Sequence, residues 1–201
     1  MANPNKVTGF TPVKYLNGAD WDSKGTVYYI DTTDTNAYFQ GDPVKLAAGL
    51  DTVGGLQTIT LGTAGATAVG ILLGVGTNRW GPFINPNDLT LVSAPVTKLV
   101  PYFALVADDP MTIFEAQEGG TGTLFTTAAA SKNANFATAT PSSGVKVSAA
   151  FIDNGTAAAT TSTFNLKLMG LKQAIDNAPG TFQKWYCLLN NHSYRTGVAG
   201  I

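Results

Sequence analysis

Short stretches in which apolar and polar residues alternate dominate the pattern of this chain. In Gln57–Leu61, Ile59 and Leu61 would lie on one side of an extended strand, and Thr58 and Thr60 on the other. Strict alternation has the period of a half-buried β-strand and not that of a helix. The stretch therefore predicts a strand with one face on a core and one toward solvent.

Another stretch is apolar without alternation. Ala68–Val75 carries no polar side chain, which predicts a central strand that is buried on both faces. Gly70 and Gly74 lie inside it, and a glycine within a strand commonly marks a bulge or the close approach of another backbone. We expect one or both of these features at the two glycines.

The remaining pattern is also that of short strands between turns. Stretches rich in β-branched and aromatic residues are separated by Gly, Pro and Asn. The other predicted strands are Val27–Ile30, Val44–Ala47, Leu89–Val92, Lys98–Val106, Met111–Gln117 and Trp185–Leu189. Many short strands at this spacing predict an all-β fold with little helix, either a β-barrel or a β-sandwich of the jelly-roll or tulip-like kind.

Asn154-Gly155 is the strongest local turn signal in the chain. It follows an alternating stretch, Val145–Phe151, and precedes another, Phe164–Leu168. Since Asn-Gly favours a two-residue hairpin turn, the pattern predicts that these stretches pair with each other. The helix candidates are short and lack a long apolar stripe: Thr127–Lys132 and Gly170–Asn177.

Residues 1–24 differ from the rest of the chain. They contain several Pro, Gly and Asn residues among isolated apolar ones, and no helical period is sustained. We expect an extended N-terminal arm, either frayed or laid as a strap over a neighbouring molecule, followed by a β domain at residues 25–201. The stretch 121–163, rich in Ala, Thr and Ser, is either part of that domain or a small lobe within it.

Charge is scarce and scattered. Charged residues make up 12% of the 201 residues, about half the usual share, and the net charge is -1. No run of Lys or Arg is present, so we do not expect direct nucleic-acid binding. The neutral surface is either merely polar or covered by partner subunits. Depletion of charge at interface cores favours the second explanation.

Targeting features are weak. Cys187 is the single cysteine, so no internal disulfide is expected, and no apolar stretch follows the first residues as in a secretory signal. The longest apolar run, Ala68–Gly76, is far shorter than the ~20 residues of a membrane-spanning helix. We expect synthesis in a cytoplasm without export, and no membrane contact.

Residues suited to catalysis or metal binding are few. The densest acidic group consists of Asp108, Asp109, Glu115 and Glu118. It lacks the spacing of a calcium loop, so we interpret it as a chain corner and an outward strand face. His192 has no nucleophile beside it and is interpreted as a hydrogen-bonding residue of a polar loop, and Cys187 as a buried apolar residue. We predict no catalytic residue, no cofactor and no metal.

Two further patterns bear on ligand binding. The glycine-rich stretch 70–81 does not fit a dinucleotide-binding loop, because Arg79 stands in the place of the third glycine and no helix is predicted after it. Aromatic residues offer a platform for sugar binding, although core packing or subunit contact is their commoner role. These residues are Trp21, Tyr28, Tyr29, Trp80, Phe83, Trp185 and Tyr186.

Parts of the sequence resemble virion proteins of tailed bacteriophages. Residues 102–117 are similar to a Val-x-Asp-Asp-Pro-x-x-x-Phe-Glu-x-Gln pattern in those proteins. Residues 176–180 with 184–192 resemble their closing segment, and residues 3–22 fit their opening. The resemblance implies a head decoration or cement protein bound outside an icosahedral shell, and it brings no catalytic residues.

We therefore expect a non-enzymatic virion protein on the capsid exterior, made in the host bacterial cytoplasm, that bridges neighbouring major capsid proteins. Its partners would be the major capsid protein and further copies of itself in a dimer or trimer. The alternative is a carbohydrate-binding or tail- or fibre-associated virion module. Deleting residues 1–20 is expected to weaken attachment and spare the fold. The residues expected to contact the capsid or a partner are Val7, Phe10, Val13, Tyr15, Trp21 and Trp80.

Overall fold

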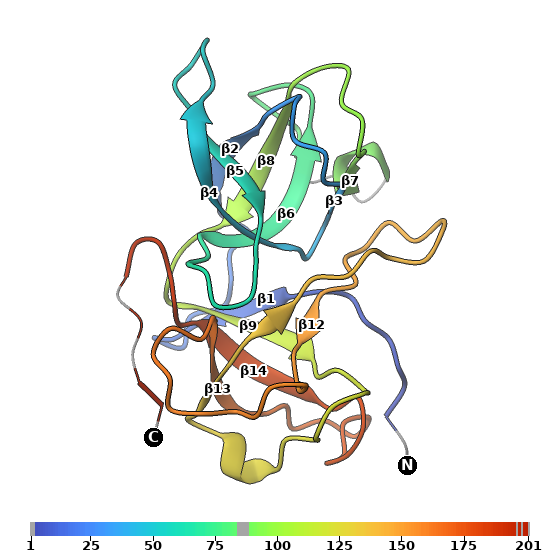
Figure 1. Ribbon diagram of the computed structural model, residues 1–201, viewed down its shortest axis with the longest axis vertical. Coiled ribbons are helices and arrows are strands. Elements are labelled where there is room, and N and C mark those ends of the chain that lie inside the picture. The colour runs from blue at the N-terminus through green and yellow to red at the C-terminus, as the bar shows by residue number, and fades with distance from the viewer. Residues whose placement is uncertain (1–2, 84–88, 196, 198, 201) are drawn as a thin grey trace.

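The chain folds into two stacked lobes, both built from β-strands (Figure 1). The computed structural model describes residues 3–83, 89–195, 197, 199 and 200. The barrel lobe comprises the described residues between 25 and 107. The sheet lobe comprises residues 3–24 together with the described residues after 107. The predicted all-β fold with little helix is confirmed.

The barrel lobe is a closed barrel of five strands in the order β2-β5-β4-β6-β8. Neighbouring strands run antiparallel, except that β2 and β5 pair in parallel at Tyr29 and Thr58. Closure leaves the barrel without an unpaired strand edge. The strands are β2 Thr26–Ile30, β4 Pro43–Leu50, β5 Gln57–Leu61, β6 Gly70–Gly76 and β8 Tyr102–Ala107.

Strand β6 confirms the prediction of a strand buried on both faces, and the structure gives the reason. Leu72 and Val75 pack in the barrel core, whereas Ile71 and Leu73 pack in the core of the sheet lobe. The register with β8 shifts between Leu72 and Gly74, which is the irregularity expected at a glycine. A Cβ atom on Gly74 would lie 1.8 Å from the Phe83 carbonyl oxygen, so close backbone approach is confirmed as well.

The sheet lobe contains an antiparallel sheet in the order β1-β9-β14-β13-β10. Its inner face carries Phe114, Trp185 and Cys187, which are buried in one apolar cluster with Phe136 and Ile152. The last two residues belong to a short ribbon, β11 Phe136–Ala137 paired with β12 Phe151–Ile152, which adds to that core. The sheet strands are β1 Thr11–Tyr15, β9 Thr112–Gln117, β10 Asn133–Ala134, β13 Leu166–Leu171 and β14 Lys184–Leu189.

Several predicted elements are corrected. Leu89–Val92, predicted as a strand, is a 3₁₀ turn, η1. The short strand β7 Ser93–Ala94 follows it directly and pairs with β3 Tyr38–Phe39. The helix predicted at Gly170–Asn177 is wrong, because β13 continues to Leu171. The other helix candidate is reduced to a single 3₁₀ turn, η2 Thr127–Ala129.

The hairpin predicted around Asn154-Gly155 is also wrong. Strand β12 pairs with β11, and β13 pairs with β14 and β10. Neither Asn154 nor Gly155 has the positive φ that the favoured Asn-Gly turn needs. The Asn154 amide instead donates to Glu118 Oε1 at 3.1 Å and to the Gly119 carbonyl at 2.7 Å. This long-range contact outweighs the local turn preference.

The expected separation of residues 1–24 from the β domain is corrected in part. Residues 11–15 form β1, an edge strand of the sheet, and Phe10 lies 1% exposed in the core. The segment before this strand is also held by the sheet lobe. The Asn3 side-chain amide donates hydrogen bonds to the Ala178 and Thr181 carbonyls, and its oxygen accepts the Ala178 N–H. Deleting residues 1–20 would therefore remove core structure, contrary to the expectation that it spares the fold.

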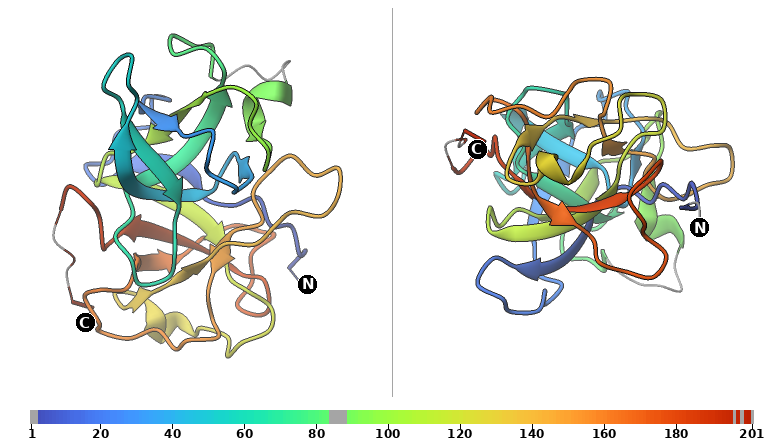
Figure 2. Two further views of the ribbon diagram at one scale, coloured as in Figure 1. Left: turned by 45° about the horizontal axis from the view of Figure 1, so that its top comes forward. Right: turned by 90° about the horizontal axis from the view of Figure 1, so that it is seen from below.

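The stretch 121–163 is not a separate lobe, because β10, β11 and β12 place it in the sheet lobe. Its loop between β11 and β12 projects from the side of the molecule in Figures 1 and 2. The base of that loop is tied to the barrel lobe, where the Ser148 N–H donates to the Gln40 carbonyl at 2.9 Å. On the other side, the Ala68 N–H donates to the Asn191 carbonyl at 2.8 Å. These contacts join the lobes into one unit.

Candidate interaction surface

Three loops lie at the end of the barrel that points away from the sheet lobe (Figure 1), and each carries exposed apolar side chains. The loops are the β4–β5 turn, the segment after β6, and the segment before β8. Val53, Trp80 and Leu99 are 85%, 87% and 91% exposed, one from each loop. The same loops carry the further exposed residues Leu50 and Val100. We call these five residues the barrel-end patch.

The charged side chains of two of these loops pair with each other. Arg79, after β6, forms an ion pair with Asp51 in the β4–β5 turn. The Asp51 carboxylate also accepts the N–H groups of Val53 at 3.2 Å and Gly54 at 3.0 Å. The guanidinium lies 5.6 Å from the centre of the Phe103 ring. The pair therefore fixes both loops and leaves little free charge beside the patch.

The charged residue of the third loop is turned inward. Lys98 is buried, and its Nζ donates to the carbonyls of Asp34 and Asn36, both at 2.7 Å. The ammonium also lies 5.2 Å from the centre of the Tyr38 ring. Burial lowers the pKa of Lys98. Its neighbours Val96, Leu99 and Val100 face solvent. The usual arrangement of a surface loop, with charged residues outside and apolar residues inside, is therefore reversed here.

Of the predicted contact residues, Trp80 alone belongs to the barrel-end patch. Val7, Val13, Tyr15 and Trp21 are half-buried on the sheet lobe. Phe10 is wrong as a contact residue, because its ring is buried and packs edge-to-face against Phe136 at 6.1 Å. The structure thus does not bring the six predicted residues together. The sequence prediction missed the exposed apolar residues of the β4–β5 and β7–β8 loops, because in the sequence alone they cannot be told from ordinary core residues.

The acidic group predicted near the chain corner is dispersed. Asp108 accepts a hydrogen bond from the Tyr28 hydroxyl at 2.8 Å, and Glu115 pairs with Lys172 and Lys184. Glu118, expected on an outward face, is fully buried, which corrects that interpretation. Over the ranges that the structure describes, no group of three or more His, Cys, Asp or Glu side chains is placed to hold a metal ion.

Glu118 is the centre of a buried network. Its Oε1 accepts the Phe125 N–H at 2.8 Å as well as the Asn154 amide. Its Oε2 accepts Gln183 Nε2 at 2.6 Å and Trp185 Nε1 at 2.9 Å. A buried carboxylate is tolerated where hydrogen bonds replace its hydration. The four donors come from three separate segments of the sheet lobe, so we interpret this network as structural.

His192 and Cys187 occupy defined structural positions. The His192 Nδ1 accepts the Tyr194 N–H at 3.0 Å, which confirms the predicted hydrogen-bonding role, but the residue is buried. Burial lowers the pKa of its imidazole, and nearby Arg195 lowers it further. Cys187 is a buried thiol in β14, as expected, and burial raises its pKa.

The proposed sugar platform is also dispersed. Trp185 and Tyr28 are buried, whereas Trp80 is almost free of contacts. A cavity of about 260 Å³ opens beside the Trp80 loop, with Thr77, Asn78 and Tyr102 in its lining. Indole stacking next to hydroxyl and amide groups is compatible with a sugar ring.

Nothing in the fold suggests a membrane-spanning helix, since no helix in the described part of the chain is long and apolar enough. Comparison of the chain with protein-family models, with curated proteins and with solved structures found no match.

Proposed function

We propose that this chain is a non-enzymatic virion structural protein that decorates the outside of an icosahedral phage capsid. It would stabilise the shell by bridging neighbouring major capsid proteins through the barrel-end patch. The observation that carries the proposal is the inversion at that end, where Asp51, Arg79 and Lys98 are paired or buried and the apolar residues point outward. The resemblance of the sequence to tailed-phage virion proteins supports the same assignment.

The physical case rests on loops that are already fixed before binding. Because the ion pair and the buried lysine hold the three loops in place, little conformational entropy is lost when a partner covers them. Exposed Trp and large aliphatic residues are the side chains that contribute most at protein interfaces. A modest affinity per subunit suffices, since many copies on one lattice act together when each bridges two neighbours.

The test is attachment to capsids that lack this protein. A triple variant, Val53→Ser, Trp80→Ser and Leu99→Ser, should bind at least about 30-fold more weakly than the unchanged chain, because hot-spot residues contribute about 2 kcal/mol or more. Its melting temperature should stay the same, since all three side chains are exposed. Ile175→Ser is the matched control, because Ile175 is 99% exposed on the sheet lobe.

Two results would overturn the proposal. One is equal loss of binding in the control and the triple variant, and the other is electron microscopy of the particle with no density for the protein on the shell.

A second candidate, a carbohydrate-binding module of the virion, is favoured by the exposed Trp80 indole on a loop that lines the cavity of Thr77, Asn78 and Tyr102. It predicts binding on a glycan array that disappears with Trp80→Ala and survives Leu99→Ser. The capsid proposal predicts that both changes weaken attachment and that no glycan is retained.

A further inference from the structure

The chain contains two Asn-Gly pairs, Asn17-Gly18 and Asn154-Gly155, and their surroundings differ sharply. An asparagine loses its side-chain amide most readily when glycine follows it. Glycine has no side chain to hinder the attack of its own backbone nitrogen on the amide carbon, and its backbone turns freely. The reaction also needs water, a leaving group that can depart and a backbone that can move. The two pairs can therefore be compared on each of these requirements.

Asn17-Gly18 forms the tip of an exposed hairpin that begins with β1. The Tyr15 N–H donates to the Ala19 carbonyl at 2.8 Å, and the Gly18 N–H donates to the Tyr15 carbonyl at 2.9 Å. Gly18 has a φ of 91°, the left-handed conformation that closes a three-residue hairpin loop. Any larger residue would be strained there. The turn thus requires the same glycine that makes Asn17 reactive.

The Asn17 side chain is exposed, and its amide is polarised. Its Oδ1 accepts the Ala19 N–H at 2.9 Å. A donor at this oxygen stabilises the negative charge that develops on it when a nucleophile adds to the amide carbon. Among the residues that the structure describes, none accepts a hydrogen bond from Asn17 Nδ2, so ammonia can leave into solvent. A Cβ atom on Gly18 would meet nothing within 4 Å, so a ring can form there without hindrance.

Asn154 is protected on each of these counts. It is 2% exposed, which keeps water away. Its Nδ2 donates to Glu118 and to the Gly119 carbonyl, and its Oδ1 accepts the Gly122 N–H at 3.0 Å. Attack by the Gly155 nitrogen would have to disrupt this buried network. Opening it costs a large part of the stability of the sheet lobe, whereas an exposed hairpin tip opens at little cost.

We propose that Asn17 is a site of spontaneous deamidation and that Asn154 is not. Opening of the turn frees the Gly18 N–H from the Tyr15 carbonyl. The Gly18 nitrogen then gives its proton to solvent and bonds to Asn17 Cγ, the Cγ–Nδ2 bond breaks, and ammonia leaves. Water opens the resulting succinimide at either of its carbonyl carbons, which yields aspartate or isoaspartate. The net change is the uptake of one water molecule and the release of one ammonia, without an enzyme or cofactor.

The product changes a hollow on the surface of the sheet lobe. This cavity of about 620 Å³ is lined by Tyr15, Leu16, Asn17, Ala19, Asp109 and Met111. Deamidation places a new carboxylate there, in addition to that of Asp109. Isoaspartate also adds a carbon atom to the main chain between positions 17 and 18, so the turn loses its hydrogen-bond geometry. We expect the hairpin to open and the bridge between Lys14 and Asp20 to be lost.

The test is incubation of the full chain at mildly alkaline pH and body temperature, followed by peptide mapping with mass spectrometry. The peptide that contains Asn17 should gain the mass difference between an amide and a carboxyl group. It should do so at least about tenfold faster than the peptide that contains Asn154, because the exposed turn opens far more readily than the buried network. An isoaspartyl methyltransferase should label the first peptide alone. In urea the two peptides should react at similar rates, since each is then an Asn-Gly pair in an unfolded chain.

Asn17→Gln is the matched variant, because glutamine would have to close a larger ring and reacts far more slowly. It should remove the modified product and leave the Asn154 peptide unchanged. Equal rates at Asn17 and Asn154 in the folded protein would overturn the inference. It would also be overturned by an unmodified Asn17 under conditions in which the unfolded chain reacts. Neither result depends on attachment to a capsid, so the inference and the proposed function fail separately.

Discussion

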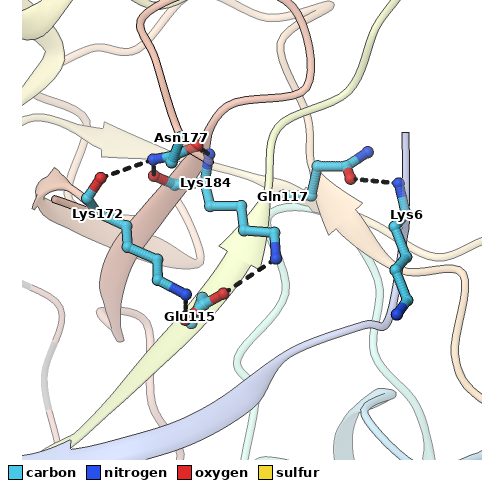
Figure 3. A network of polar contacts seen from close by, with 6 residues as sticks. All are labelled: Lys6, Glu115, Gln117, Lys172, Asn177 and Lys184. Atoms are coloured by element: carbon cyan, nitrogen blue, oxygen red, sulfur yellow. Dashed lines mark hydrogen bonds and ion pairs between the residues drawn. The ribbon is translucent and has the colours of Figure 1, made fainter. Parts of the chain in front are cut away.

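Each of the two lobes is stabilised by a different kind of interaction. The barrel core is made of apolar strand residues such as Ile30, Val44 and Leu72, and few buried polar groups lie near it. In the sheet lobe, by contrast, buried Asn, Gln and Glu side chains link loops to one another. Asn177, for example, joins its loop to the carbonyls of Lys172 and Lys184 (Figure 3). Local pattern thus specifies the barrel, whereas the sheet lobe depends on contacts between distant segments.

The largest expected effect tests the backbone packing of the barrel. Gly74→Ala would place a Cβ atom 1.8 Å from the Phe83 carbonyl oxygen, so the backbone of β6 or of the segment that holds Phe83 would have to shift. We expect a loss of more than about 4 kcal/mol in the free energy of unfolding, enough to prevent folding. Soluble yield and thermal unfolding measured by circular dichroism would show it.

Gly155→Ala is the matched control in the sheet lobe, where a Cβ atom would meet only the end of the Asp153 side chain at 3.1 Å. We expect a change within about 0.5 kcal/mol there, as for most exposed positions. A folded Gly74→Ala protein of normal stability would contradict the close approach of β6 to Phe83.

The next effect tests the buried network of the sheet lobe. Glu118→Gln keeps the shape of the side chain but turns an amide NH₂ toward groups that are themselves donors, such as Gln183 Nε2 and Trp185 Nε1. We expect a loss of about 3 to 4 kcal/mol, because a buried donor would be left without an acceptor and the charge-assisted bonds would be lost. Urea unfolding followed by tryptophan fluorescence measures it.

Glu115→Gln, on the outer face of the strand β9 that ends just before Glu118, is the control. That carboxylate is partly solvated and pairs with surface lysines, so its loss should cost about 1 kcal/mol or less. Similar losses for the two glutamates would mean that the polar network does not set the stability of the sheet lobe.

The same contrast explains what could be predicted from the sequence. In the barrel lobe, the strand at Gln57–Leu61 and the doubly buried strand near Ala68–Val75 are found where they are predicted. The predicted solvent face of the first strand is wrong in part, because Thr58 is buried. Each signal there is local, since alternation and glycine position follow directly from strand geometry. The signal failed at Leu89–Val92, where a short apolar stretch fits a turn as well as a strand.

In the sheet lobe, predictions failed where a polar side chain had a distant partner. Asn154 was assigned to a turn because its neighbour is glycine, and Glu118 to a surface because it is charged. No local pattern indicates that these two residues meet, at a separation of 36 positions. The barrel-end patch was missed for a related reason. Exposed Leu99 and buried Leu72 are the same residue type, and only the fold separates them.

The smallest of the three effects concerns a buried carboxylate in the barrel lobe, Asp42. It accepts the Ser148 hydroxyl and, at 2.8 Å, the Phe39 N–H, which is less compensation than the four donors of Glu118. Burial raises the pKa of Asp42 to about 6, against which the Ser148 bond acts only in part. The native carboxyl therefore holds its proton at a pH where the unfolded chain has released it.

The sign of the pH dependence follows from that difference. Between about pH 4 and pH 6 the unfolded chain loses a proton that the native protein retains, so the free energy of unfolding falls as pH rises, by about 2 to 3 kcal/mol. Above the native pKa both states are ionised and the contribution stays constant. Asp42→Asn cannot ionise, and its amide can donate to the Ser148 oxygen while its carbonyl accepts the Phe39 N–H. Urea unfolding of both chains at pH 4 to 7 should show the variant gaining stability relative to the unchanged chain across this range, since titrations common to both cancel in the difference. A difference that is constant with pH would mean that Asp42 is solvated in the native protein, and that the barrel lobe tolerates an ionised group as readily as the sheet lobe does.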